Sequence, residues 1–238
     1  MSRRHLLMTA AAPVLANLVR RASDILLAGL ALLLLAPLML AIVLAIRLES
    51  PGSAFFCQIR LGQGGRPFRM YKFRKFHAGA GQAGSPLTLA QDPRMTRVGR
   101  LLMKTKLDEL PQLWNVLRGD MAVVGPRPES LAFADCFENG WSEVLRYRPG
   151  LIGPCQIVFR NEAAAFPEGA DVREFYRTVL FPLKARIDLD YFRSRSLVSD
   201  VGIMLGAFLA ICGWRSSTSE SLANLARGAA APARAATL

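Results

Sequence analysis

The chain has 238 residues, 52% of them hydrophobic, and a formal net charge of +12 at pH 7. This length allows one domain of ordinary size, and soluble cytosolic domains seldom combine so much apolar content with so much positive charge. Four scattered cysteines without a C-x-x-C pair, and only two histidines, argue against a zinc site and favour free thiols in a reducing compartment. Residues 47–118 hold 13 basic and 4 acidic side chains, hence +9 of the +12. Such a patch attracts phosphates, nucleic acid or an acidic membrane face.

The N-terminal region predicts membrane contact. Residues 1–21 are mildly apolar with four arginines and lack a clear cleavage pattern, so we expect an arm or surface helix. Ile25 to Ile46 is 22 residues without a charge, long enough to cross a hydrocarbon core of roughly 30 Å. A plain transmembrane helix is one interpretation. Pro37 in the middle and basic residues on both flanks favour the other, a re-entrant helix that breaks at Pro37 and returns to the cytoplasmic side. Asp24, at the entry, is expected to meet Arg20 or Arg21.

A hairpin is expected next. Residues 55–60 and 68–73 have the composition of strands and flank the glycine loop 62–65, which is typical of a hairpin turn. In residues 68–76 aromatic residues alternate with Arg69, Lys72 and Arg74, which would place one set in the core and the other in solvent. The same alternation is found on nucleic-acid-binding surfaces. Residues 77–91 are rich in Gly, Ala and Gln and predict a flexible loop.

Two adjacent carboxylates, Asp108 and Glu109, lie in the most basic part of the chain. Apolar residues recur with helical spacing from Leu107 to Leu117, and Pro111 is tolerated only in a first helical turn. Asp108 is therefore expected at or near the N-cap. It could be a cap alone, or a carboxylate nucleophile held near a positive helix end.

The neighbouring cations bear on that choice. Five basic residues precede the pair: Arg94, Arg97, Arg100, Lys104 and Lys106. They could form a solvated basic face, or they could gather phosphates and lower carboxylate pKa values. Arg127 follows, held between two prolines, which suits a guanidinium that contacts phosphate. Residues 201–214 are uncharged but too short to span, so we expect an interfacial helix or a buried core helix, followed by a disordered tail from 215.

These motifs together resemble the bacterial sugar transferase family, the monotopic polyprenyl-phosphate phosphoglycosyl transferases. The resemblance runs from about Arg21 to Gly206 and matches the short form of the family. The stretches that carry it are Lys72-Phe73-Arg74, Asp92-Pro93-Arg94, Leu107 to Leu117 (LDELPQLWNVL), Gly119-Asp120-Met121, Val124 to Pro128 (VGPRP) and Arg148 to Pro154 (RPGLIGP).

The resemblance implies an α+β, mostly helical, monotopic membrane protein. Its expected parts are an arm (1–21), a re-entrant membrane helix (22–47), a catalytic domain with amphipathic interfacial helices (48–214) and a disordered tail (215–238). It would lie at the bacterial cytoplasmic (inner) membrane with the catalytic domain on the cytoplasmic face. The implied partners are a UDP-sugar, undecaprenyl phosphate, inner-membrane lipids and glycosyltransferases of the same pathway, but no nucleic acid.

The implied reaction moves a sugar 1-phosphate from the UDP-sugar to undecaprenyl phosphate, releases UMP and initiates exopolysaccharide, capsule, O-antigen or other surface glycan synthesis. By the motif match, Asp108 is the nucleophile that forms a phosphosugar-aspartyl intermediate, and Glu109 assists it or holds Mg²⁺. The same match implies substrate or phosphate contacts for Lys72, Arg74, Arg94, Arg127, Arg148 and Asp188. Mg²⁺ on Asp108 and Glu109 suits hard oxygen ligands.

This chain departs from the family pattern at several positions. Lys75 and Phe76 replace a common Thr-Met pair, Ala36 replaces a frequent serine before Pro37, and Ile152 replaces a frequent threonine. Because none of these touches Asp108-Glu109, they bear on the donor sugar and local geometry. Two noncatalytic alternatives remain: a basic membrane protein that binds anionic lipid or nucleic acid, which would show salt-dependent affinity unaffected by Asp108→Asn, and a scaffold for polysaccharide assembly.

Overall fold

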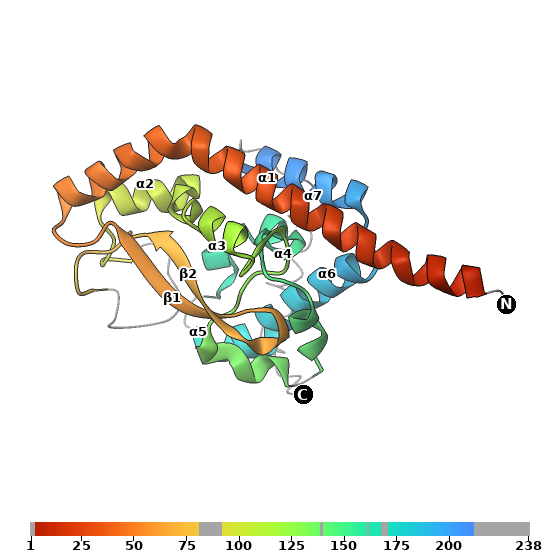
Figure 1. Cartoon of the computed structure of the whole chain (residues 1–238). Helices are drawn as coiled ribbons and strands as arrows, with labels where there is room; N and C mark the ends of the chain where they lie inside the picture. Colours follow the sequence, from red (N-terminus) through yellow and green to blue (C-terminus); the bar gives the residue numbers. More distant parts are fainter. Residues whose placement is uncertain (1–2, 81–91, 139, 161, 168–170, 212–238) are drawn as a thin grey trace, which may run out of the picture.

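A computed structural model describes residues 3–80, 92–138, 140–160, 162–167 and 171–211 (Figure 1). The helices are α1 (Arg3–Glu49), α2 (Arg97–Thr105), α3 (Gln112–Arg118), α4 (Pro154–Val158), α5 (Val172–Phe175), α6 (Phe181–Arg193) and α7 (Leu197–Ile211). The strands are β1 (Phe55–Leu61), β2 (Pro67–Phe73), β3 (Ala122–Val124) and β4 (Gly150–Ile152). They form an antiparallel pair, β1–β2, and a parallel pair, β3–β4. The prediction of a mostly helical chain is confirmed. The expected tail, and residues 81–91 of the expected loop, lie outside the described residues.

The first helix contains both N-terminal segments expected from the sequence. It runs through Pro37 without interruption, and Figure 1 shows its axis bending part way along. Within the described ranges, it supplies the one helix, Val14–Glu49, that is long and apolar enough to cross a membrane. Many of its leucines face outward, and Leu26 and Leu33 are 71% and 74% exposed. Because burying such side chains is favourable, this helix needs an apolar environment that the other described residues do not supply.

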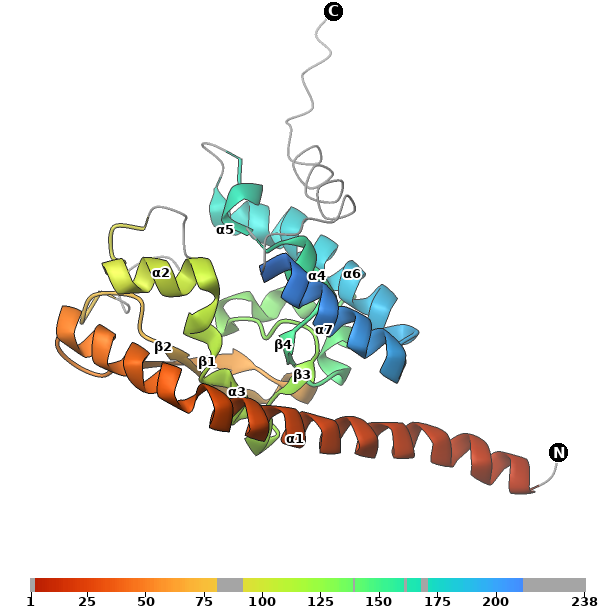
Figure 2. The same ribbon diagram turned by 90° about the horizontal axis from the view of Figure 1, so that it is seen from above.

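Polar contacts fix α1 to the rest of the molecule. Asp24 was expected to pair with Arg20 or Arg21, but its carboxylate accepts the backbone N–H of Val123 in β3 at 2.9 Å. Arg21 donates to two carbonyl oxygens at the end of α3, at 2.6 and 2.8 Å. Arg20 pairs with Asp200 of α7 at 3.1 Å. These contacts place α1 and α7 on the same side of the molecule (Figures 1 and 2).

The expected hairpin is confirmed, with Phe55 opposite Phe73 and Leu61 opposite Pro67. Its turn uses glycines with positive φ, Gly64 and Gly65, a conformation that costs other residues more. Phe73 is 1% exposed and faces the core. The neighbouring Lys72 was expected in solvent, but its side chain is only 11% exposed, because it turns toward Glu109.

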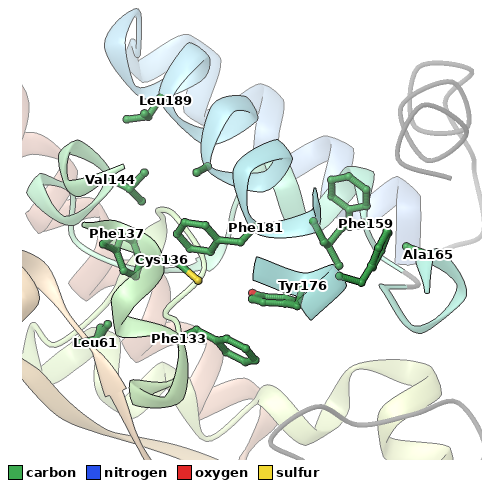
Figure 3. Close-up of a cluster of buried hydrophobic side chains, with 13 residues drawn as sticks. Leu61, Phe133, Cys136, Phe137, Val144, Phe159, Ala165, Tyr176, Phe181 and Leu189 are labelled. Atoms are coloured by element: carbon green, nitrogen blue, oxygen red, sulfur yellow. The ribbon is translucent and has the colours of Figure 1, made fainter. Parts of the chain in front are cut away.

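The largest core lies under the hairpin and is built from aromatic rings (Figure 3). The rings of Phe133 and Tyr176 lie 4.4 Å apart, and those of Phe137 and Phe181 lie 4.9 Å apart. A π-helical turn (Tyr176–Leu180) joins α5 to α6. The Tyr176 hydroxyl donates to the Glu129 carboxylate at 2.6 Å. This buried hydrogen bond joins the aromatic core to the segment that carries Arg127.

Candidate active site

The Asp108-Glu109 pair lies in a short 3-10 turn, Leu107–Glu109, between α2 and α3. Lys106 ends α2 with φ 62° and ψ 12°, and it is the one non-glycine residue with positive φ in the described part of the chain. That left-handed residue turns the chain so that the two carboxylates follow at once. The expectation that Asp108 caps the next helix is wrong, because α3 begins after Pro111 and has no side-chain cap. The carboxylate of Asp108 is thus left for another role.

Asp108 is 3% exposed. Its Oδ2 lies 3.9 Å from Nζ of Lys75. Burial, together with the negative charge of Glu109, raises the pKa of Asp108, while Lys72 and Lys75 oppose the shift. A carboxylate that is poorly solvated and held by a single distant cation is a stronger nucleophile than one in water or in a tight ion pair.

Glu109 is bound much more tightly. Its two oxygens accept both guanidinium nitrogens of Arg127, at 2.7 and 3.1 Å. Nζ of Lys72 lies 3.4 Å from Oε1. Against the effect of burial, Arg127 and Lys72 hold the pKa of Glu109 well below its usual range, and burial lowers the pKa of Lys72 to about 8. Glu109 is therefore ionised and fixed in orientation.

Backbone packing positions the three cations around the pair. Lys72 lies on β2 and Lys75 two residues beyond its end. The carbonyl of Lys75 accepts the N–H of Thr96, and a Cβ on Gly99 would lie 2.0 Å from that oxygen, so only glycine allows this approach. Arg127 follows Gly125, where a Cβ would lie 2.5 Å from the backbone nitrogen of Gly150 in β4. The hairpin, α2 and the β3–β4 pair thus meet at the carboxylates.

Two other residues predicted to contact substrate lie apart from Glu109. Arg74 donates to the carbonyls of Ser50 and Pro51, at 2.7 and 2.6 Å, and so holds the turn after α1. Arg94 forms a 2.6 Å ion pair with Asp92 and lies over the ring of Phe76. Nζ of Lys75 lies over the same ring, so Arg94 and Lys75 are close in space although 19 residues separate them. Phosphate contact by these arginines stays a prediction.

Asp188 and Arg148 also have partners of their own. The Asp188 carboxylate is 4% exposed and accepts the backbone N–H of Cys155 in α4 at 3.0 Å. Burial raises the pKa of Asp188 to about 7, although that hydrogen bond opposes the shift. Arg148 lies close enough to Asp24 to stabilise its charge. Asp188 thus supports the start of α4, and among the described residues no hydrogen bond or ion pair joins Asp188 or Arg148 to Asp108 or Glu109.

Sequence reasoning missed several residues of this region. Lys75 was noted only as a departure from the family pattern, yet it is the cation paired with Asp108. Arg60 on β1 donates to the carbonyl of Pro128 and supports the segment that carries Arg127. Lys184 on α6 is 6% exposed and binds Glu129 at 3.2 Å. No local pattern in the sequence distinguishes Arg60 or Lys184 from ordinary basic residues.

A cleft of about 260 Å³ opens beside Glu109, and Asp108 is not among its lining residues. Glu109, Arg127 and Lys106 lie at one part of its wall, and Ala207 and Ala210 of α7 lie at another. The cleft therefore connects the carboxylate-cation cluster to the helix that shares a side of the molecule with α1 (Figure 2).

A divalent metal fits this donor set through one carboxylate. The described residues contain no group of three or more His, Cys, Asp or Glu side chains placed to hold a metal. Mg²⁺ commonly uses one or two protein carboxylates and completes its coordination with water and substrate phosphates. Asp108 offers an oxygen for this, whereas both oxygens of Glu109 are engaged by Arg127 and Lys72.

A buried carboxylate pair among lysine and arginine side chains, below a long exposed apolar helix, defines a membrane-associated protein with a site suited to phosphate chemistry. The chain belongs to the bacterial sugar transferase family, whose family model matches residues 15–213. This confirms the predicted family.

Relatives agree with that assignment. The chain is 42% identical over 197 residues to the UDP-glucose:undecaprenyl-phosphate glucose-1-phosphate transferase of Caulobacter vibrioides, covering 81% of this chain and 69% of that protein. It is 41% identical over 192 residues to the UDP-N-acetylgalactosamine-undecaprenyl-phosphate N-acetylgalactosaminephosphotransferase of Aeromonas hydrophila, covering 78% and 42%. It is 32% identical to the exopolysaccharide production protein ExoY of Rhizobium meliloti over 224 residues, 88% and 92% of the two chains. These names agree with the predicted enzyme class.

Proposed function

We propose that this chain is an undecaprenyl-phosphate sugar-1-phosphate transferase. It takes a sugar 1-phosphate from a UDP-sugar, passes it to undecaprenyl phosphate, releases UMP and initiates synthesis of a surface glycan. The observation that carries the proposal is the contrast within the carboxylate pair. Asp108 is buried, with Lys75 at 3.9 Å and Lys72 acting on its charge without an ion pair, whereas Glu109 is fixed by direct contacts from Arg127 and Lys72.

The proposed reaction has two displacements at one phosphorus atom. An oxygen of Asp108 attacks the sugar-linked phosphorus of the donor. The bond from that phosphorus to the bridging oxygen breaks, and UMP leaves with the electron pair. An oxygen of the lipid phosphate then attacks the same phosphorus and the Asp108 carboxylate is released. A covalent intermediate allows the soluble donor and the lipid acceptor to use one site in turn.

The other charged residues neutralise and orient the reacting groups. Lys72, Lys75 and Arg127 reduce the repulsion between the carboxylates and the donor diphosphate, and they stabilise charge that develops on the phosphoryl oxygens. Glu109 keeps the arginine in place. Mg²⁺, held by Asp108 and the donor phosphates, would supply further charge neutralisation at the diphosphate. The phosphate contacts expected for Arg74, Arg94, Arg148 and Asp188 are secondary in this scheme, because those side chains already have partners.

The membrane arrangement is part of the proposal. We infer that α1 enters the cytoplasmic leaflet of the inner membrane, turns at its bend and returns, and that α7 lies in the interface. Support comes from the exposed leucines of α1 and from its polar anchors, Arg20, Arg21 and Asp24, which bind the globular part. If residues 25–46 crossed the membrane, Arg20, Arg21 and Asp24 would lie on the side opposite α3, β3 and α7, whose atoms they bind. A tag at residue 1 decides: accessibility from the cytoplasmic side supports the re-entrant arrangement, and accessibility from the far side refutes it.

The test of the activity uses detergent-solubilised protein, Mg²⁺, undecaprenyl phosphate and a panel of UDP-sugars, with UMP release as the readout. Asp108→Asn keeps the size and removes the nucleophilic charge, and Asp190→Asn, an exposed residue of α6, serves as the matched control. UMP release that requires the lipid, the metal and Asp108 supports the proposal. Folded protein that releases no UMP with any donor, or equal release by Asp108→Asn, refutes it.

A further inference from the structure

The cleft beside the carboxylate pair has two walls of different chemistry. One wall carries four basic and two acidic side chains: Lys106, Glu109, Arg127, Arg160, Glu162 and Lys184. The other is mostly apolar and includes Leu110, Leu151, Ile157, Ala207 and Ala210, with Gln156 as a polar member. A ligand that fits both walls has an anionic head and an apolar body, because a polar group against the aliphatic wall would lose its hydrogen bonds to water.

The cations of the polar wall differ in availability. Arg127 is bound to Glu109, and Lys184 is bound to Glu129 and Glu162. Lys106, in contrast, lies beside the carboxylate pair and forms no ion pair within 4 Å in the part of the chain that is described, although Asp108 and Glu109 both sense its charge. An incoming phosphate can therefore meet Lys106 without displacing an acidic partner.

The aliphatic wall continues into an apolar outer surface through α7. The inner side of this helix presents small residues, Ala207 and Ala210 toward the cleft and Gly206 toward α4, where a Cβ on Gly206 would lie 3.5 Å from Ile157. The outer side presents Leu205 and Phe208, which are 59% and 63% exposed. In both views α7 lies against α4 on the same side of the molecule as α1 (Figures 1 and 2). One helix thus separates the cleft from the exposed apolar surface.

We propose that this cleft is the subsite for the lipid acceptor, with the acceptor phosphate at Lys106 and Arg127 and its first isoprene units along the aliphatic wall. This inference rests on the proposed function and adds the location of one of its two substrates. Glu109, the chain neighbour of Asp108, lines the cleft, so a phosphate oxygen held there would approach the phosphorus of the aspartyl intermediate from the Glu109 side and release the Asp108 carboxylate. The small residues of α7 leave the room that the branched chain needs.

The test separates the two half-reactions. Ala207→Trp and Ala210→Trp fill the cleft from different turns of α7, and Leu205→Trp adds an indole to the outer side of the same helix as the matched control. Each protein is first given UDP-glucose or UDP-N-acetylgalactosamine labelled in the sugar, without acceptor, and the labelled protein and UMP are measured. Undecaprenyl phosphate is then added and the loss of label from the protein is followed.

We expect both filled variants to become labelled at the wild-type rate and to lose the label about tenfold or more slowly at the same undecaprenyl phosphate concentration, as for other filled apolar pockets. Leu205→Trp should behave as wild type in both steps. The proposal would be overturned if both filled variants lost the label to undecaprenyl phosphate at the wild-type rate. It would also be overturned if labelling by the UDP-sugar fell equally in both filled variants, which would assign the cleft to the donor. Failure of the proposed function is a different result, namely wild-type protein that neither releases UMP nor becomes labelled.

Discussion

Substitution of Asp188 by asparagine should remove a pH-dependent cost to stability. Asp188 is 4% exposed and accepts the N–H of Cys155, and burial raises its pKa from 3.8 to about 7. The folded protein therefore binds a proton at Asp188 more tightly than the unfolded chain does. This contribution to stability is fully present below about pH 4 and is lost as the pH rises through about 7. A shift of about 3 pKa units corresponds to roughly 4 kcal/mol.

The asparagine variant keeps an oxygen that can accept from Cys155 and carries no charge at any pH. The free energy of unfolding of Asp188→Asn should therefore not fall as the pH rises through about 7, as that of the wild type does. At pH 8 the variant should be at least as stable as the wild type. Asp188→Ala, in contrast, leaves the buried N–H of Cys155 without its acceptor and should be about 1–3 kcal/mol less stable than Asp188→Asn at every pH. Asp190→Asn, two residues along α6 and exposed, controls for the loss of one carboxylate.

The assay is thermal unfolding of the detergent-solubilised proteins between pH 4 and pH 8. Since 1 kcal/mol shifts Tm by roughly 2–4 °C in a chain of this size, the wild-type Tm should fall by up to about 8–16 °C more than that of Asp188→Asn over this range. Parallel Tm curves for the two proteins would refute the reasoning. They would mean that Asp188 is ionised in the folded protein well below pH 7.

Three further substitutions test the carboxylate-cation cluster and its support. Arg127→Lys keeps the charge but loses the two-point contact with Glu109, so UMP release should fall roughly tenfold or more. Arg127→Ala should lower UMP release further. If Arg127→Lys released UMP at the wild-type rate, the two-point geometry would have no role in activity. Lys75→Met removes the cation paired with Asp108, and formation of the labelled protein should slow about tenfold or more, whereas an unchanged rate would assign the pair no role in nucleophile activation. Gly125→Ala would place a Cβ 2.3 Å from a backbone oxygen, so it should lower both Tm and UMP release, because β3 and β4 must separate and Arg127 moves with them; a Tm within about 1 °C of wild type would contradict the close packing.

The sequence predicted the elements that depend only on residues close together in the chain. Alternation and a glycine turn predicted the hairpin, and Gly119 ends α3 with φ 88°, as expected for a helix C-cap. The uncharged run from Ile25 to Ile46 predicted an apolar helix, since hydrophobic length is a property of consecutive residues. The adjacent carboxylates and Arg127 were also identified from their motifs. In the structure Arg127 binds Glu109 directly, although 18 residues separate them.

Only the tertiary structure decided which charged side chains meet. Arg74 and Arg94 occur in motifs as specific as those of Lys72 and Arg127, and Asp188 was predicted to contact substrate with them, yet these side chains bind a turn, a neighbouring aspartate and the start of α4. Lys75 broke the family pattern and is the residue that contacts Asp108. A charged side chain takes its role from the partner within about 4 Å, and that partner is set by the packing of distant elements. The sequence determined the kinds of groups available to the site, and the packing of β2 and α2 against the Leu107–Glu109 turn, with Arg127 brought in by the segment after β3, determined which of them surround the nucleophile.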